Sequence, residues 1–359
     1  MTKTMIIPAT QKAALLTAFG KDIEIQYDYP VPAVADLTPG QCLVRLDVSG
    51  VCHSDLHIQR GEFRAIPTFP FIGGHEGIGT IVALSPGTQA TLLADIGRRV
   101  GIKWLADACT KCELCRTGYE PLCTSSKLSG YTTNGTFSEY VVAAINHVVP
   151  IPDNVDSKAA VSILCAGLTV YKGLKVSNTK VGNWVVIPGA GGGLGHLAIQ
   201  YAVAMGLRVL AIDTGAEKKR MCLEVGAEKW IDFRESADVV KDVVEACDGR
   251  GPHAALITSP SGIAYDNAIM YLRPTGTLVC VAMASPEYSL RSPVGLIIGK
   301  SLTIVGSVLG NLQDAIEALD LVARKKVKTH FSTRKLEEIN DVFQELHSGQ
   351  LVGRAVIQF

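Results

Sequence analysis

The spacing of apolar residues changes along the chain, and its two parts predict different architectures. From Trp184 onward, short apolar runs alternate with stretches of helical periodicity, the pattern of a parallel sheet with crossover helices. Six runs have the character of buried strands: Trp184–Ile187, Arg208–Ile212, Trp230–Phe233, Ala254–Thr258, Thr277–Ala282 and Leu302–Gly306. Six such strands predict a doubly wound α/β sheet of the kind that binds dinucleotides.

Before about Thr169 the pattern predicts a mostly β domain. Short alternating segments, such as Gln41–Val48, Gly79–Leu84 and Tyr140–Ala144, are separated by Gly and Pro. Near the C-terminus, Leu312–Ala323 has the apolar spacing of an amphipathic helix, and Arg354–Phe359 is a final strand. We expect that strand to return to the first domain. The predicted domains are therefore residues 1–165 with 308–359, and residues 166–307.

Composition adds size and charge to this picture. The chain has 359 residues, of which 47% are hydrophobic and 19% are charged, enough to build two buried cores. Lys plus Arg and Asp plus Glu number 34 each, so no net positive field attracts a phosphate backbone. We therefore expect no nucleic-acid partner.

The N-terminus and the apolar runs predict a soluble, cytoplasmic protein. Residues 1–16 carry only Lys3 and Lys12 as charges, and polar residues and Pro8 interrupt the apolar ones, unlike a signal or transit peptide. No uninterrupted run of about 18 apolar residues is present, so a membrane span is not expected.

A Gly-rich segment follows the first strand of the predicted parallel sheet. It has five glycines and continues into a helix with apolar Leu194 and Leu197. Glycines let the backbone approach a pyrophosphate, and the helix N-terminus offers free amide donors. We expect dinucleotide contacts from Gly189, Gly191, Gly192, Gly193, Leu194 and Gly195.

An acidic residue ends the second strand of this sheet, at Asp213. A carboxylate there accepts hydrogen bonds from the ribose hydroxyls of NAD and repels the 2′-phosphate of NADP. We therefore expect NAD, although nearby Lys218 is able to assist either cofactor.

Four of the ten cysteines lie within fifteen residues, at Cys109, Cys112, Cys115 and Cys123. Such crowding in a reducing compartment favours metal binding over disulfides. The C-x2-C-x2-C-x7-C spacing folds four thiolates around one point. Tetrahedral zinc with four sulfur ligands has no open position for substrate, so we expect structural zinc in a lobe of residues 109–123. A redox-active C-x-x-C pair and an iron–sulfur cluster are the competing interpretations.

Three scattered residues, Cys52, His75 and Cys165, are candidates for a second metal. Spacing alone does not decide their role, because a buried Cys is commonly a small hydrophobe and a lone His a satisfied core residue. The motifs that surround them, and others along the chain, are Gly50-Val-Cys-His-Ser-Asp-Leu-His57, Gly73-Gly-His-Glu-Gly77, Gly101-Ile-Lys-Trp-Leu105, Ser129-Gly-Tyr131, Leu164-Cys-Ala-Gly-Leu-Thr-Val-Tyr-Lys172, Ile304-Val-Gly-Ser307 and Gly349-Gln-Leu-Val-Gly-Arg354.

With the cysteine lobe and the Gly-rich loop, these motifs resemble the zinc-containing medium-chain alcohol dehydrogenases, especially their yeast and fungal branch. The resemblance runs from about residue 41 to residue 354, nearly the whole chain. It implies a Rossmann NAD-binding domain at residues 166–307 and a GroES-like catalytic domain in the rest. It also implies a homo-oligomer, either a tetramer or a dimer. The apolar stretches Val294–Ile298 and Leu302–Leu309 would lie at a subunit interface; the alternative is that they are core strands.

The resemblance implies a catalytic zinc held by Cys52, His75 and Cys165, with a fourth position for water or the alcohol oxygen. Two thiolates and a neutral imidazole leave this site formally neutral, so the ion stays a Lewis acid. Asp55 would orient His75, and Glu76 would lie beside the metal as a transient ligand. Together with the lobe, this gives two zinc ions per chain.

The resemblance also assigns a proton relay and further cofactor contacts. The relay starts at Ser54, passes through the cofactor ribose and reaches solvent at His57. On the residues alone, Ser54 as a helix cap and His57 as a surface residue is the alternative. The remaining cofactor contacts are His53 and Arg354 at the pyrophosphate, Thr169 and Leu194 at the nicotinamide, and Met283. A salt-bridged Arg354 is the alternative to a phosphate contact.

Departures from the family pattern cluster where the substrate would bind. Arg60 and Phe63 replace the His and Trp typical of yeast ethanol-oxidising enzymes, Ser54 replaces Thr, and Trp104 is retained. Phe in place of Trp enlarges a pocket and Ser in place of Thr removes a methyl group, so we expect alcohols bulkier than ethanol to be tolerated. In the Gly-rich loop, Ala190 takes the first glycine position of a G-x-G-x-x-G motif ending at Gly195.

The leading hypothesis is thus a zinc- and NAD-dependent dehydrogenase that interconverts an alcohol and its aldehyde or ketone. A carbonyl reductase of specialised metabolism on the same scaffold is the alternative within enzymes, and sequence cannot separate the two directions of one reaction. A non-catalytic zinc-binding scaffold is the alternative from a different class, and the intact set of Cys52, His75 and Cys165 argues against it.

Overall fold

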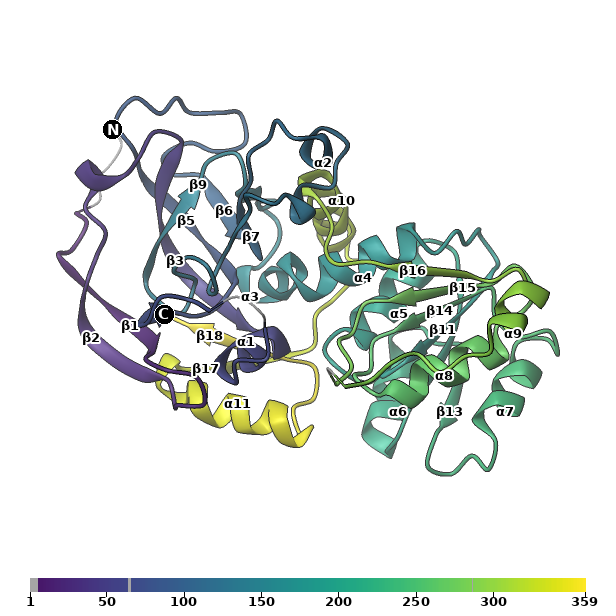
Figure 1. The fold of residues 1–359 in the computed structure, drawn as a ribbon. Helices are drawn as coiled ribbons and strands as arrows, with labels where there is room; N and C mark the ends of the chain where they lie inside the picture. Colours follow the sequence, from purple (N-terminus) through teal and green to yellow (C-terminus); the bar gives the residue numbers. More distant parts are fainter. Residues whose placement is uncertain (1–5, 64–65, 286) are drawn as a thin grey trace. The chain divides into compact units, whose positions relative to one another are not determined.

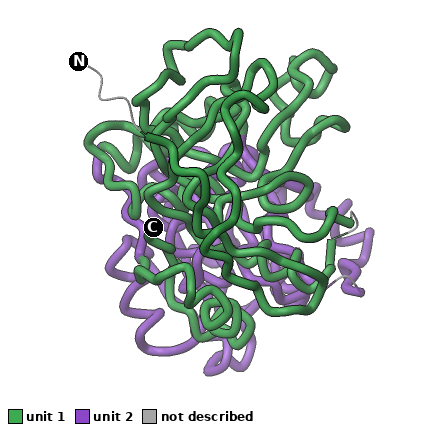
Figure 2. Tube along the Cα trace, turned by 90° about the vertical axis from the view of Figure 1, so that its left-hand side faces the viewer, with its two compact units in different colours: residues 1–165, 311–323, 331–359 green, residues 166–310, 324–330 purple. Residues whose placement is uncertain are grey.

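A computed structural model describes residues 6–63, 66–285 and 287–359. The chain forms two compact units (Figure 2), each described below by itself. Unit 1 comprises Met1–Cys165, Asn311–Ala323 and Phe331–Phe359, and unit 2 comprises Ala166–Gly310 and Arg324–His330. The first five residues of the predicted first domain lie outside the described residues.

Unit 2 is built on a six-stranded sheet in which every neighbouring pair is parallel (Figure 1). Its spatial order, β13-β12-β11-β14-β15-β16, is that of a doubly wound dinucleotide-binding sheet. The strands are β11 Trp184–Pro188, β12 Arg208–Asp213, β13 Lys229–Asp232, β14 Ala254–Ile257, β15 Thr277–Cys280 and β16 Thr303–Gly306. The predicted fold class and all six predicted strands are confirmed, with ends that differ by at most two residues.

The helices of unit 2 cover both faces of this sheet. They are α4 Ala166–Lys175, α5 Gly195–Ala204, α6 Ala216–Glu224, α7 Val239–Ala246, α8 Gly262–Tyr271 and α9 Val294–Gly299. Along β14, Ala255 and Ile257 belong to one core with residues of α8, whereas Leu256 meets Gly173 of α4. Alternate side chains of one strand therefore face different helices, and both need to be apolar.

A short segment, residues 324–330, belongs to unit 2 although residues on either side of it belong to unit 1. The side chain of Gln200 on α5 holds it: Nε2 donates to the carbonyl of Lys328, and Oε1 accepts from the Lys328 N–H. The N–H of His330 donates to Nε2 of His196, also on α5. Because these polar side chains are buried, their hydrogen bonds to the segment satisfy both partners.

Unit 1 is mostly β structure, as the sequence predicts. Its strands are β1 Thr10–Leu16, β2 Glu24–Pro30, β3 Gln41–Val51, β4 Phe71–Ile72, β5 Glu76–Leu84, β6 Arg99–Ile102, β7 Leu105–Asp107, β8 Lys127–Leu128, β9 Tyr140–Ala144, β10 Val149–Pro150, β17 Phe331–Arg334 and β18 Arg354–Gln358. Its helices are α1 His53–Gln59, α2 Glu113–Arg116, α3 Ser157–Val161, α10 Leu312–Ala323 and α11 Ile339–Ser348, with 3-10 turns at Val34–Asp36, Glu120–Leu122, Ser162–Leu164 and Leu336–Glu338.

The long strand β3 organises the main sheet of unit 1. It pairs antiparallel with β5, β9 and β18, and β18 in turn pairs parallel with β17. The C-terminal strand therefore returns to the N-terminal part of the chain, as predicted, and its Ala355 lies opposite Val51 at the end of β3. The last residues of the chain thus complete the sheet directly before Cys52.

The helices of the chain are short. The longest among the described residues is α10, with 12 residues, and its bounds are those predicted from its amphipathic pattern. Within the described ranges, no helix is both long and apolar enough to span a bilayer.

Candidate functional site

Four potential ligands from separate parts of unit 1 meet in a buried group. Cys52 precedes α1, His75 directly precedes β5, Glu76 begins that strand, and Cys165 ends the first segment of the unit. One ligand atom from each lies within 4.8 Å of those of the others. His75 and Glu76 are fully buried, and Cys52 is 4% exposed. The structure therefore brings together the three residues proposed as ligands and the carboxylate proposed beside them.

The separations in this group fit one tetrahedral ion. Cys52 Sγ and Cys165 Sγ are 3.9 Å apart, and His75 Nε2 is 3.3 Å from Cys165 Sγ. Zinc bonds of about 2.3 Å to sulfur and about 2.0 Å to nitrogen predict tetrahedral edges of about 3.8 and 3.5 Å. The donor set, two sulfurs and an imidazole, is also one that zinc prefers. Donor type and spacing thus both fit zinc.

Asp55 fixes two members of the group at once. Its Oδ2 accepts the backbone N–H of Cys52 at 2.8 Å, a reverse capping contact at the start of α1. Its Oδ1 is 2.8 Å from His75 Nδ1, so that nitrogen carries the proton and donates, and Nε2 is directed at the two sulfurs. Asp55 is itself 4% exposed. Asp55 thus contacts both Cys52 and His75, and its role in orienting a zinc-bound His75 stays a prediction.

Glu76 is held by a buried arginine. Arg354, the first residue of β18, donates through Nη2 to Oε1 of Glu76, and both side chains are at most 4% exposed. The other carboxylate oxygen, Oε2, has no hydrogen-bond partner among the described residues. A Cβ atom added to Gly50 would lie only 2.1 Å from this oxygen. Arg354 and Glu76 are 278 residues apart, so their pairing leaves no signal in the sequence. The pyrophosphate contact of Arg354 stays a prediction.

The charges of this group compete with one another. Burial raises the pKa of Glu76 to about 7, although Arg354 opposes that shift. The Cys165 thiol, as a hydrogen-bond partner, lowers the pKa of Cys52 well below its usual value, while the same contact raises the pKa of Cys165. Burial alone would lower the pKa of His75, but Asp55 raises it. A divalent cation would stabilise both thiolates together and compete with the proton for Nε2.

Aromatic rings line one side of the group. Trp104 meets the His75 ring edge-to-face at 5.0 Å, and Trp104 stacks on Tyr131 at 6.1 Å. Phe63 is 5.9 Å from Trp104 and 5.3 Å from Tyr131. Sequence analysis singled out Phe63 and Trp104 but gave Tyr131 no role. These rings form an apolar wall that excludes water from the buried ligands.

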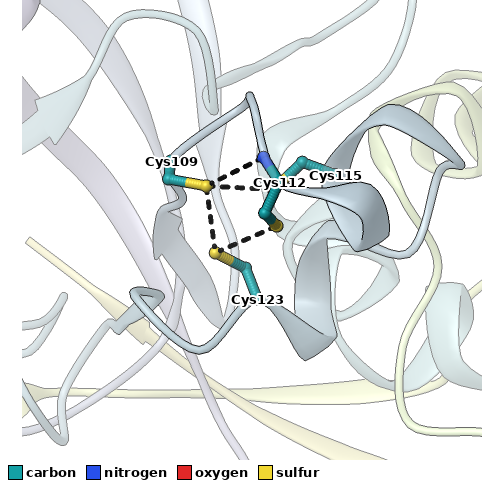
Figure 3. A group of neighbouring side chains, drawn as sticks. All are labelled: Cys109, Cys112, Cys115 and Cys123. Atoms are coloured by element: carbon teal, nitrogen blue, oxygen red, sulfur yellow. Dashed lines mark hydrogen bonds between the residues drawn. The ribbon is translucent and has the colours of Figure 1, made fainter.

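The second group of potential ligands is the cysteine lobe (Figure 3). Cys109 Sγ is 3.9 Å from Cys115 Sγ and 3.6 Å from Cys123 Sγ, and Cys112 Sγ is 3.9 Å from Cys123 Sγ. These separations again match the edges of a tetrahedron around zinc. With four sulfurs as its corners, such a site has no position for a substrate.

The loop geometry of the lobe prepares it for a cation. Backbone N–H groups of Lys111 and Cys112 donate to Cys109 and lower the pKa of its thiol to about 6. Thr110 has a positive φ of 57°, which turns the chain tightly between the first two cysteines. The apolar core here is small, with Leu105, Ala108 and Cys123 buried. A metal ion would therefore contribute much of the stability of the lobe.

The Gly-rich loop of unit 2 joins β11 to α5. Gly189 has a φ of 82°, and a Cβ on it would lie 2.8 Å from the Ser259 nitrogen. A Cβ on Gly195 would lie 2.2 Å from the carbonyl oxygen of Gly189. The loop is therefore closed on itself before α5 begins, a conformation that requires glycine at these two positions.

Asp213 ends β12 beside this loop. Its Oδ2 accepts the Gly191 N–H at 2.9 Å, and its Oδ1 accepts from the Thr214 N–H at 2.9 Å and from Lys218 Nζ at 3.1 Å. Asp213 is only 6% exposed, and three hydrogen bonds hold its carboxylate. The structure thus gathers the loop, Asp213 and Lys218 in one place, and their contacts with a ribose and a pyrophosphate stay predictions.

The other residues singled out in the sequence are divided between the units. In unit 1, His53, Ser54 and His57 lie along α1, and Ser54 Oγ is 3.8 Å from Cys52 Sγ. In unit 2, Thr169 is buried on α4, Leu194 precedes α5, and Met283, just after β15, is 46% exposed. Their assigned roles stay predictions.

Comparisons with known proteins identify the family. Residues 38–153 match the alcohol dehydrogenase GroES-like domain, and residues 193–324 match the zinc-binding dehydrogenase family. Alcohol dehydrogenase 1 of Emericella nidulans is 41% identical over 355 residues, which cover 99% of each chain. This chain belongs to the zinc-dependent medium-chain alcohol dehydrogenases. Alcohol dehydrogenase of Schizosaccharomyces pombe is 40% identical and covers 98% of this chain and 99% of its own.

Solved structures of this alcohol dehydrogenase family have the same fold. The alcohol dehydrogenase of Aeropyrum pernix has a TM-score of 0.87 at 30% identity and covers 97% of this chain and 100% of its own. Acetophenone reductase from Geotrichum candidum, solved with NAD, has a TM-score of 0.85 at 25% identity and covers 99% of each chain. The family and the fold class predicted from the sequence are confirmed.

The close approach of Gly50 to Glu76 generates a prediction. In Gly50→Ala, the new methyl group would overlap Oε2 of Glu76, so the carboxylate or strand β3 has to shift. We expect a loss of about 1–3 kcal/mol of stability, seen as a lower melting temperature, and reduced zinc content by atomic absorption. Gly295→Ala is the control, because no atom lies within 4 Å of its Cβ position. Equal behaviour of the two variants would contradict this account of Gly50.

Proposed function

We propose that this chain catalyses the reversible, NAD-linked oxidation of an alcohol to an aldehyde or ketone, with zinc held by Cys52, His75 and Cys165. The observation that carries the proposal is the convergence of these three donors on one point in a chain of this family. The cysteine lobe holds a second, structural zinc. Carbonyl reduction is the reverse of the same reaction and uses the same residues.

Bound zinc supplies Lewis acidity that lowers the pKa of the alcohol hydroxyl group, and bound NAD supplies the hydride acceptor. The chain contributes the environment for both. Asp55 holds the Nδ1 proton of His75 and so keeps Nε2 available. The wall of Phe63, Trp104 and Tyr131 excludes water, which strengthens electrostatic interactions inside.

Proton transfer is assigned to α1. We assign Ser54 Oγ, near Cys52, to accept the alcohol proton, and His57, further along the helix, to pass it to solvent. In unit 2, the Gly-rich loop is assigned to the pyrophosphate and Asp213 to the adenosine ribose, which favours NAD because a 2′-phosphate would meet a buried carboxylate.

Zinc and activity should be lost together. We expect two zinc ions per purified chain and NAD reduction, followed by its absorbance, with primary alcohols. Cys165→Ala should hold one zinc and lose at least about 100-fold in kcat, because removal of a ligand disables the Lewis acid. Cys222→Ala is the matched control, since that buried thiol belongs to neither group of ligands. Full activity of Cys165→Ala, or of chelator-treated enzyme without zinc, would refute the proposal.

The aromatic wall predicts the size of the substrate. Phe63 fills less space than the Trp typical of yeast ethanol-oxidising enzymes, so we expect higher kcat/KM for hexanol and benzyl alcohol than for ethanol. The similarity to an enzyme named acetophenone reductase is in line with larger substrates. In Phe63→Trp, the ratio of benzyl alcohol to ethanol should fall by about 10-fold, the effect of a few methylene-sized contacts. A wild-type preference for ethanol would contradict this expectation.

We also propose a cytoplasmic homotetramer. All ten cysteines are thiols, as a reducing compartment requires. In unit 2, β16 is an edge strand with Ile304 40% exposed, and nearby Val294, Ile298 and Val308 are 68%, 71% and 58% exposed. An apolar edge of this kind is suited to two-fold pairing with a second copy.

The oligomer proposal has a direct test. Light scattering after size-exclusion chromatography should give four times the chain mass of 38.2 kDa. Ile304→Lys combined with Val308→Asp should reduce the mass, because charge at the edge opposes pairing. Val181→Asp, at an apolar residue that is 81% exposed elsewhere in unit 2, is the control and should keep the wild-type mass. A monomeric wild-type protein would exclude the tetramer.

A further inference from the structure

Helix α1 ends in a turn that brings Glu62 back to His57. Gly61 has a positive φ of 72°, its N–H donates to the Ile58 carbonyl, and the Glu62 N–H donates to the His57 carbonyl at 3.0 Å. These two bonds form a Schellman motif, for which glycine is the preferred residue. A Cβ at Gly61 would also lie 2.9 Å from the ring of Phe19. The backbone therefore fixes Glu62 next to His57.

The side chains of the same two residues also meet. Oε2 of Glu62 lies 2.5 Å from Nδ1 of His57, a short hydrogen bond. A carboxylate can only accept, so Nδ1 carries the proton, and in the neutral imidazole Nε2 is left as an acceptor. That is the tautomer required of an imidazole that takes up a proton through Nε2.

The charged groups around His57 come from α1 and the turn that follows it. Arg60 Nη1 lies 4.0 Å from the other oxygen of Glu62, and the His53 ring is 5.3 Å from the His57 ring. Phe63 covers another side at 6.5 Å. Helix α11 also packs against α1, and among the described residues it forms no ion pair with His57. Glu62 is thus the carboxylate in contact with this imidazole.

We propose that Glu62 is a positioning residue for the proton relay, which sets the His57 tautomer and stabilises the imidazolium that forms when Nε2 takes up a proton. This inference rests on the proposed function, in which His57 passes the proton of the alcohol to solvent. The proton that the relay carries from Ser54 arrives at Nε2 and leaves from Nε2 to water, while Nδ1 keeps its own proton and its hydrogen bond to Glu62. In carbonyl reduction the same steps run in reverse.

The His57–Glu62 pair is too exposed to contribute much to the stability of the fold. The side chains of His57 and Glu62 are 21% and 31% exposed, and partly exposed ion pairs contribute little to folding. Arg334 and Glu345 form a matched pair, 26% and 34% exposed with a 3.3 Å contact, away from the buried ligand group. Glu345→Gln is therefore the control for Glu62→Gln, and both variants should fold.

The first measurement is independent of activity. Nitrogen-15 NMR of histidine-labelled protein, with His57 assigned by its absence in His57→Gln, reports the tautomer of the ring. We expect the Nδ1–H tautomer in the wild type. In Glu62→Gln the share of the Nδ1–H tautomer should fall, because an amide oxygen is a weaker acceptor than a carboxylate. Glu345→Gln should leave the tautomer unchanged, and Glu62→Asp should restore part of the Nδ1–H form.

The second measurement is kcat for alcohol oxidation. Glu62→Gln should reduce kcat about 3- to 10-fold, because His57 is no longer held in the tautomer that the relay requires. The KM for NAD should change less than about 2-fold. In His57→Gln, adding Glu62→Gln should have no further effect, because the positioned group is gone.

Two results would overturn the proposal: an Nε2–H tautomer in the wild type, or a Glu62→Gln loss that persists in full on the His57→Gln background. Failure of the proposed function is separate from both. It would appear as no NAD-linked alcohol turnover by the wild type, whereas the NMR spectrum would still show whether Glu62 sets the tautomer of His57.

Discussion

The carboxylate of Asp55 holds the centre of this enzyme together. One oxygen receives the N–H that begins helix α1, and the other receives the imidazole proton of His75, so a ligand from a helix start and a ligand from a strand are fixed to the same side chain. Cys165 completes the group, with its Sγ 3.9 Å from Cys52 Sγ and 3.3 Å from His75 Nε2. The register of β3 and β5 serves this arrangement, because Gly50 pairs with Glu76 next to both ligands.

Buried negative charge is the second constraint. Glu76, Asp55 and two thiols lie close to one another in unit 1, where desolvation penalises every anion. Arg354 compensates Glu76, and the two thiols lie 3.9 Å apart, so a second thiolate would repel the first. A divalent ion would offset this repulsion, which is why the arrangement belongs with metal chemistry rather than with a polar core.

Sequence patterns predicted those features that are local or periodic. The strands of unit 2 are buried on both faces, so they appear as continuous apolar runs, and the cysteine lobe lies within one loop. Cys52 and Cys165 are 113 residues apart, and only the resemblance to a family connected them. The pairing of Arg354 with Glu76 and the anchoring of residues 324–330 by Gln200 were not predicted, because single polar residues leave no periodic signal. Glu62 had a weak local signal, an acidic residue directly after the glycine that ends a helix.

The antiparallel pairing of Ala355 with Val51 has a consequence for biosynthesis. During translation the sheet of unit 2 becomes available as one uninterrupted stretch, from Trp184 to Gly306, and is able to form while synthesis continues. The edge of strand β3 beside Cys52 is covered only after Arg354–Gln358 have been synthesised. The order of synthesis therefore favours a nucleotide-binding sheet that forms before this edge is paired and before Arg354 reaches Glu76.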